Sequence, residues 1–202
     1  MARSGCKIFL LAATLLLSLI GGSPTVFAQL TDENLVFSLP QGYKLGYQSS
    51  KNNIQMQEFV PQSETVETWT ALVTVQIFHG RNSMDPGQFL RGMGEQFLAT
   101  CPGAKPNTIH SGQANGYKVS MLFLQCPLNP QTGKPENTLF RAIEGNDSFY
   151  LVQKAFRFAP SDAQVDEAAK YLGTVNVCDS RLPDRPCPNL QAQGFHSAPI
   201  PK

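Results

Sequence analysis

The sequence lacks the motifs that identify the common enzyme classes. No GxSxG or HExxH motif frames a histidine, and no GxGxxG or phosphate-binding loop follows a strand pattern. No pair of cysteines has CxxC spacing, which argues against a familiar zinc site. No basic block stands out, although nucleic acids and anionic membrane surfaces both require concentrated positive charge. We therefore expect no nucleic-acid partner and no cofactor.

Long apolar runs are also scarce, and the one present lies near the N-terminus. Residues 8–20 are mostly apolar, they follow the basic Arg3 and Lys7, and Val26-Phe27-Ala28 matches a signal-peptidase site. A bilayer needs about 20 apolar residues, so this run is short for a transmembrane helix. We predict a signal peptide over residues 1–28, with an uncleaved N-terminal anchor as the alternative. The remaining chain has no integral membrane segment, and export to the periplasm is favoured over secretion.

Cleavage after Ala28 leaves few cysteines, and their number is even. They are Cys101, Cys126, Cys178 and Cys187. An even number in an exported chain indicates disulfides, and four cysteines allow three connectivities. We favour Cys101–Cys126, which joins a predicted helix end to a strand end, and Cys178–Cys187, which closes a short loop rich in turn residues. Free buried thiols are the alternative.

The patterning predicts an α+β fold. Residues 35–40, 53–60 and 69–78 read as strands, and hairpins are predicted at Asn115-Gly116 and at residues 145–147. Helices are predicted after Asp85, which is followed by a proline, and after Ser161. The arm after the second hairpin places four residues on one face: Tyr150, Val152, Phe156 and Phe158.

Runs of strands followed by helices favour a mainly antiparallel sheet packed against two helices. We expect a signal peptide over 1–28, a single domain over 29–178 and a proline-rich tail over 179–202 with little regular structure. Residues 29–34 read as a loose lead-in.

Two stretches carry resemblances. "LVFSLPQGYKLGYQ" resembles the opening of PsbP-like domains, and the order of predicted elements is similar to that fold. "ETVETWTALVTVQIF" resembles a segment of uncharacterised exported bacterial proteins. The resemblance implies a PsbP-like α/β sandwich that acts as an accessory or binding module without catalytic groups. The four cysteines and the proline-rich tail depart from that pattern.

The candidate binding residues lie in and around the strand predicted over 69–78. Trp69 is expected to anchor its apolar face together with Val73, and His79 and Arg81 follow its end. Catalysis needs a base held by an orienting group, and no such frame surrounds the histidines. Glu64 and Glu67 precede the strand and are expected to be solvated.

The sequence therefore predicts an exported, disulfide-stabilised, non-enzymatic binding or accessory domain. Its partner would be a protein or a small molecule. One alternative is an exported hydrolase or metal-binding enzyme that uses His79 or His110. Another is an envelope-assembly protein whose proline-rich tail contacts a partner.

Overall fold

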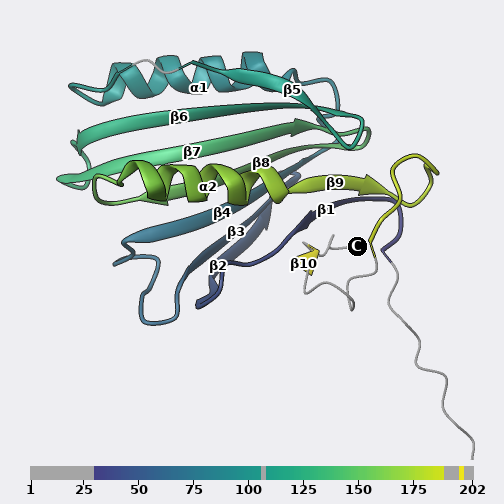
Figure 1. Cartoon of the computed structure of the whole chain (residues 1–202), viewed down its shortest axis with the longest axis horizontal. Helices are drawn as coiled ribbons and strands as arrows, with labels where there is room; N and C mark the ends of the chain where they lie inside the picture. The colour runs from purple at the N-terminus through teal and green to yellow at the C-terminus, as the bar shows by residue number, and fades with distance from the viewer. Residues whose placement is uncertain (1–29, 106–107, 189–195, 198–202) are drawn as a thin grey trace, which may run out of the picture.

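The computed structural model describes residues 30–105, 108–188 and 196–197, and shows an α+β fold (Figure 1). The predicted signal peptide and half of the predicted tail lie outside the described residues. Among the described residues, no helix is long and apolar enough to cross a membrane. The prediction of a mainly antiparallel sheet packed against two helices is confirmed.

The main sheet has seven strands, and every neighbouring pair is antiparallel. In spatial order the strands are β2 (Tyr43–Lys51), β3 (Ile54–Pro61), β4 (Ala71–His79), β8 (Ser148–Phe156), β7 (Lys134–Glu144), β6 (Tyr117–Asn129) and β5 (His110–Ala114). The hairpin predicted at Asn115-Gly116 joins β5 to β6. Both turn residues have positive φ, 48° and 76°, which a tight two-residue turn requires.

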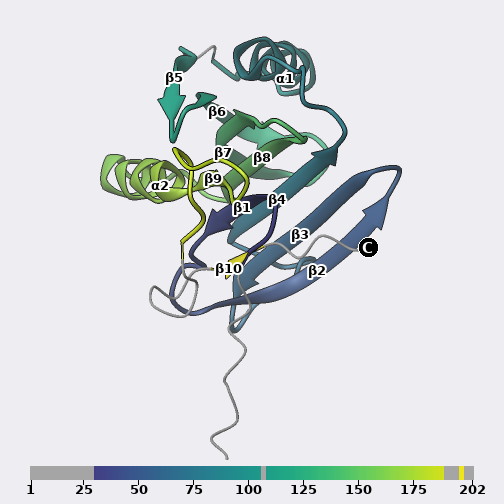
Figure 2. The same ribbon diagram turned by 90° about the vertical axis from the view of Figure 1, so that its right-hand side faces the viewer.

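The two helices lie on opposite faces of this sheet (Figure 2). Helix α1 (Pro86–Thr100) begins after Asp85, whose side chain accepts a hydrogen bond from the Gln88 backbone N–H at 2.9 Å. Helix α2 (Asp162–Thr174) begins with a capping box, in which Ser161 and Gln164 each bond the other's backbone N–H. Both starts agree with the predicted caps.

A second, three-stranded sheet joins regions from the two ends of the chain. Its order is β10 (His196–Ser197), β1 (Glu33–Phe37) and β9 (Asn176–Asp179). One expectation was wrong here. Glu33 and Asn34 belong to β1 rather than to a loose lead-in, because they pair with β9. Residues 196–197, in the predicted tail, pair with the other edge of β1.

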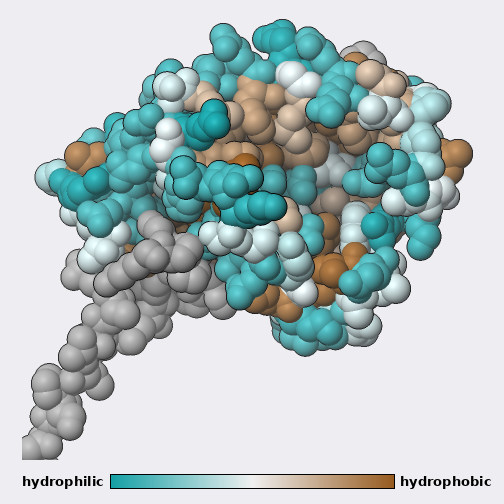
Figure 3. All heavy atoms as spheres, turned by 180° about the vertical axis from the view of Figure 1, so that it is seen from behind, coloured by the Kyte–Doolittle hydropathy of each residue, from teal (hydrophilic) through white to brown (hydrophobic). Residues whose placement is uncertain are grey.

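The sheet has an apolar core on each side. On the side of α2, helix and small sheet cover buried residues that include Leu35, Phe37, Val73, Val152 and Leu172. On the side of α1, the buried residues include Leu90, Leu122, Phe140, Phe149 and Leu151. Partly buried hydrophobic side chains pack against this second core. A view from behind shows tan and brown atoms in the upper part of the molecule (Figure 3).

Trp69 lies on a different side of the sheet from that expected. Strand β4 begins at Ala71, and Trp69 precedes it in a turn region. It packs with Val60, Leu72 and Ala155 in a small third core, whereas Val73 faces α2. The chain leaves the strand alternation because the Glu64 carboxylate accepts hydrogen bonds from the Thr70 backbone N–H, at 2.7 Å, and hydroxyl, at 2.6 Å.

The four cysteines of the described residues form two disulfides, Cys101–Cys126 and Cys178–Cys187, which are the pairs favoured from the sequence. The first joins the end of α1 to β6. The second ties the segment after β9 back to the small sheet, so residues 180–187 are held against the body of the protein.

Candidate ligand-binding site

Lys154 is a buried cation on the α2 side of the sheet. It lies on β8, where the alternate residues Tyr150, Val152 and Phe156 enter the core beneath α2. Strand alternation therefore points Lys154 into the same interior, and the residue is only 8% exposed. A fully buried lysine is rare in proteins unless its charge is paired.

The ammonium group of Lys154 is incompletely paired. Its Nζ donates a hydrogen bond to the Tyr43 hydroxyl and lies 4.1 Å from the centroid of the Tyr43 ring. Within the described part of the chain, no carboxylate lies within 4.0 Å of this nitrogen. Burial lowers the pKa of Lys154 to about 8, although the charges of Glu167 and Glu64 act in the opposite direction.

Lys154 lines a cavity of about 560 Å³ between α2 and the sheet. One wall comes from α2, and the others come from the end of β8, the start of β4 and the chain around the start of β2. The apolar lining residues are Pro40, Ala71, Phe156, Phe158 and Ala168, and the polar ones are Gln41, Tyr43, Thr70, Lys154, Gln164, Glu167 and Tyr171.

Two tyrosines add hydroxyl groups to the cavity lining. Burial, assisted by the charges of Glu64 and Glu167, raises the pKa of Tyr43 to about 12. Burial also raises the pKa of Tyr171, and Tyr43 contributes to that shift. The Tyr171 hydroxyl is buried without a hydrogen-bond partner among the described residues. Both phenols therefore stay protonated at neutral pH and can donate hydrogen bonds.

This arrangement is suited to an anionic group. A protonated amine lines a cavity whose wall also includes two phenols, and a low-dielectric wall strengthens the interaction of the amine with a negative charge. The phenylalanine side chains and Ala168 supply apolar surface for the rest of a ligand. Glu167 and Glu64 contribute negative potential nearby, which disfavours a second acidic group.

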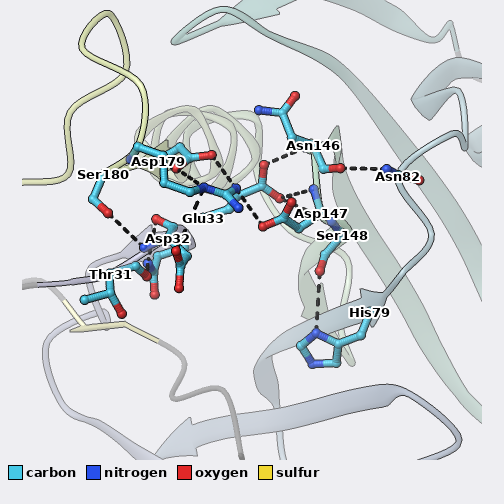
Figure 4. Close-up of polar contacts among 12 residues, drawn as sticks. Thr31, Asp32, Glu33, His79, Asn82, Asn146, Asp147, Ser148, Asp179 and Ser180 are labelled. Carbon is cyan, nitrogen blue, oxygen red and sulfur yellow. Dashed lines mark hydrogen bonds and ion pairs between the residues drawn. The ribbon is translucent and has the colours of Figure 1, made fainter.

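A second buried charge, Glu33 on β1, lies in a very different setting (Figure 4). Its carboxylate accepts hydrogen bonds from the backbone N–H groups of Asn146, Asp147 and Ser148 and from the Tyr150 hydroxyl. The residue is 2% exposed, so this carboxylate is buried and bonded on both oxygens. It joins β1 to the β7–β8 turn.

Arg181 extends this connection to the C-terminal side. Its guanidinium contacts the carboxylates of Asp179, at 2.6 Å, and Asp147, at 2.7 Å. The hydrogen bond from Arg181 holds the pKa of Asp179 below its ordinary value, against the effect of burial. The small sheet is therefore connected to the main one by four charged residues: Glu33, Asp147, Asp179 and Arg181.

The structure separates the binding residues predicted from the sequence. Trp69 precedes β4, is 6% exposed and lies beneath the Arg157 guanidinium, 3.9 Å from the ring centroid. His79 ends β4 and Arg81 follows it, so about ten residues of extended chain, roughly 30 Å, separate them from Trp69. Trp69 therefore does not share one site with His79 and Arg81.

The two histidines of the alternative hypothesis are also apart. His79 places Nδ1 3.5 Å from the Ser148 hydroxyl, whereas His110 is exposed on the edge strand β5. Strands β8, β7 and β6 lie between them, which amounts to four strand spacings of about 4.8 Å each. The described residues contain no group of three or more His, Cys, Asp or Glu side chains arranged to hold a metal.

Sequence reasoning missed Lys154, Tyr43 and Tyr171. One signal was available, because Lys154 has the same strand parity as Tyr150, Val152 and Phe156 and so had to face the interior. Tyr43 gave no such signal. It meets Lys154 only because β2, at the far edge of the sheet, brings it there, and no local pattern encodes that contact.

Comparisons with known proteins give structural neighbours but no family. No protein-family model matches the chain, and no curated protein matches it. The structure is similar to LpqN, described as involved in cell envelope biogenesis of Mycobacterium tuberculosis, at 13% identity and a TM-score of 0.42, over 78% of this chain and 87% of that one. It is also similar to the Ran-binding protein Mog1p of Saccharomyces cerevisiae, at 10% identity and a TM-score of 0.43, over 84% of this chain and 96% of that one.

Proposed function

We propose that this protein is an exported, non-enzymatic binding domain whose ligand is a small molecule with one acidic group. The signal-peptide pattern at residues 1–28 supports export, with the periplasm as the favoured compartment. Two disulfides support an oxidising environment. The PsbP-like resemblance, which implies an accessory or binding module, is part of the same proposal.

The observation that carries the proposal is the state of Lys154. Burying a charge without a partner opposes folding, because the charged group loses its hydration without gaining a compensating interaction. Here the ammonium lies at the wall of a cavity and bonds only a neutral phenol among the described residues. An anion in that cavity would supply the direct ion pair that Lys154 does not make with the described residues.

The cavity also limits the size and charge of the ligand. A volume of about 560 Å³ lies within the range of roughly 300–1,000 Å³ that is usual for small-molecule sites. The aromatic rings of Phe156 and Phe158 favour a flat or aliphatic body. The nearby carboxylates of Glu167 and Glu64 disfavour a second negative charge. We therefore infer a monocarboxylic acid of moderate size, aromatic or aliphatic.

The test compares acids with their neutral isosteres. The chain is purified after export, so that both disulfides form, and a panel of aromatic and medium-chain monocarboxylic acids is titrated by calorimetry beside the matching primary amides. We expect the acid to bind at least about tenfold more tightly than its amide, since a charge-assisted hydrogen bond contributes about 1.5–3 kcal/mol.

Two variants locate the binding. Lys154→Met should abolish the preference for the acid. Lys118→Met is the matched control, because the Lys118 side chain is 62% exposed and pairs with Glu144 at the surface. It should bind like the parent protein. Equal binding of acid and amide by the parent protein, or an acid preference that survives Lys154→Met, would contradict the proposal.

A further inference from the structure

The surroundings of Lys154 also suit a reaction that simple acid binding does not require. The amine is 8% exposed, it touches a cavity rather than close-packed side chains, and its only hydrogen-bond partner among the described residues is the Tyr43 hydroxyl. A primary amine in an apolar cavity, in contact with a phenol, has the chemistry needed to capture a carbonyl group.

We propose that Lys154 captures aldehydes covalently as imines, with the Tyr43 hydroxyl assisting proton transfer. The inference rests on the proposed function, because it uses the same cavity, and it adds a class of ligand and a covalent step. The neutral Nζ attacks the carbonyl carbon, a carbon–nitrogen bond forms, and the carbonyl oxygen takes up one of the two protons of the attacking nitrogen to give a carbinolamine. The carbon–oxygen bond then breaks, and the hydroxyl leaves as water.

The protons balance within the pair of residues. Tyr43 protonates the departing hydroxyl, and the proton lost from Nζ returns to the phenolate. The net change is amine plus aldehyde to imine plus water, with no oxidation or reduction. Tyr43 is placed for this role because its hydroxyl is hydrogen-bonded to the reacting nitrogen.

The fraction of Lys154 that is neutral at pH 7 also supports the capture of aldehydes. Because burial lowers the pKa of Lys154 to about 8, about a tenth of the side chain is neutral at pH 7. A lysine with an ordinary pKa of about 10.4 is neutral in only about one molecule in 2,500 at that pH. Lys154 should therefore react well before solvent-exposed lysines such as Lys118.

The walls of the cavity bear on the shape of the aldehyde. An imine at Lys154 would lie near the Phe156 ring, whose centroid is 5.7 Å from Nζ, and beneath α2. An aromatic aldehyde has the shape that these apolar walls favour.

The test uses benzaldehyde and sodium cyanoborohydride, which reduces an imine to a stable benzylamine. The exported protein is treated at pH 7, and the modified residues are located by peptide mass spectrometry. We expect a benzyl group on Lys154 at least about tenfold sooner than on Lys118. Tyr43→Phe should slow the labelling of Lys154 and leave that of Lys118 unchanged.

Lys154→Arg should lose the label, because arginine forms no such imine. The preference of the parent protein for acids over amides, measured by calorimetry in the same preparation, separates this inference from the proposed function. Labelling spread over exposed lysines and absent from Lys154, in a protein that still prefers acids to amides, would overturn the capture of aldehydes alone. Absence of both Lys154 labelling and acid binding would overturn both proposals.

Discussion

Glu33 and Lys154 are two buried charged side chains on the α2 side of the main sheet, and they differ in how completely they are hydrogen-bonded. Glu33 receives four hydrogen bonds, three of them from consecutive backbone N–H groups. Lys154 makes one hydrogen bond within the described part of the chain, to a neutral phenol. A buried charge whose hydrogen bonds are complete stabilises one conformation, whereas a buried charge that lacks them destabilises the protein.

The position of each residue explains the difference. Glu33 lies where β1 meets the β7–β8 turn, so its hydrogen bonds unite segments that are more than a hundred residues apart. Lys154 joins distant segments by a single hydrogen bond, to Tyr43, and it lines a cavity. The comparison therefore assigns Glu33 to the architecture of the protein and Lys154 to its function.

The largest effect is expected for Glu33→Gln. The amide nitrogen would face backbone donors in place of a carboxylate oxygen, so at least one N–H would lose its acceptor. We expect a loss of about 4 kcal/mol in the free energy of unfolding, measured in urea. Glu95→Gln, at an exposed position on α1, should change it by less than about 0.5 kcal/mol. If Glu33→Gln left the free energy of unfolding unchanged, Glu33 would not stabilise the fold as the comparison requires.

Lys154→Met should act in the opposite direction. The variant removes the buried ammonium and keeps most of the side-chain volume. The lowered pKa of Lys154 corresponds to about 3 kcal/mol of unfavourable burial at neutral pH, so the variant should unfold later than the parent by up to that amount. Thermal and urea unfolding would show the gain. A destabilised but folded Lys154→Met protein would mean that Lys154 supports the fold.

The lowered pKa of Lys154 predicts that the stability of the protein depends on pH. The pKa of Lys154 is about 8 in the folded chain and about 10.4 in the unfolded chain, so between these values the unfolded chain binds more protons. Stability therefore rises with pH in this window, by about 2 kcal/mol from pH 7 to pH 9.5. The rise is measured as the difference between the parent protein and Lys154→Met, which cancels the other groups. A difference that stays constant with pH would contradict the burial of the charge.

The smallest effects concern the hydroxyl groups beside each charge. Tyr150→Phe removes one hydrogen bond to Glu33 and should cost about 1 kcal/mol of stability. Tyr43→Phe removes the hydrogen bond to Lys154 and should change stability by less than about 0.5 kcal/mol, because the cavity admits water in place of the hydroxyl. The unfolding curves of the two variants should be measured side by side. Equal losses of stability in both would contradict the difference between Glu33 and Lys154.

Much of the fold was predictable because its signals are local. Asp85 and Ser161 mark the helix starts through their own side chains, and Asn115-Gly116 forms its turn through its own backbone preferences. Trp69 was assigned to the wrong face because Glu64 bends the chain just before β4, a tertiary contact that alternation alone does not reveal.

The candidate site was not predictable to the same extent. Its three polar groups come from β2, β8 and α2, and they meet only after a seven-stranded sheet has formed with α2 packed upon it. Strand parity placed Lys154 inside, but its pairing with Tyr43 is a property of the assembled interior. The sequence drew attention to Trp69, His79 and Arg81 because their residue types are chemically distinctive, whereas Lys154 resembles any other lysine.

The most direct test is the titration of Lys154 itself. Nuclear magnetic resonance of the protein labelled with ¹³C at the lysine Cε, with Lys154→Met to assign the signal, measures its pKa with and without a bound monocarboxylic acid. We predict a pKa of about 8 in the free protein and a higher value with the acid bound, because the anion stabilises the ammonium. A pKa near the ordinary 10.4 that does not change when acid is added would contradict the account.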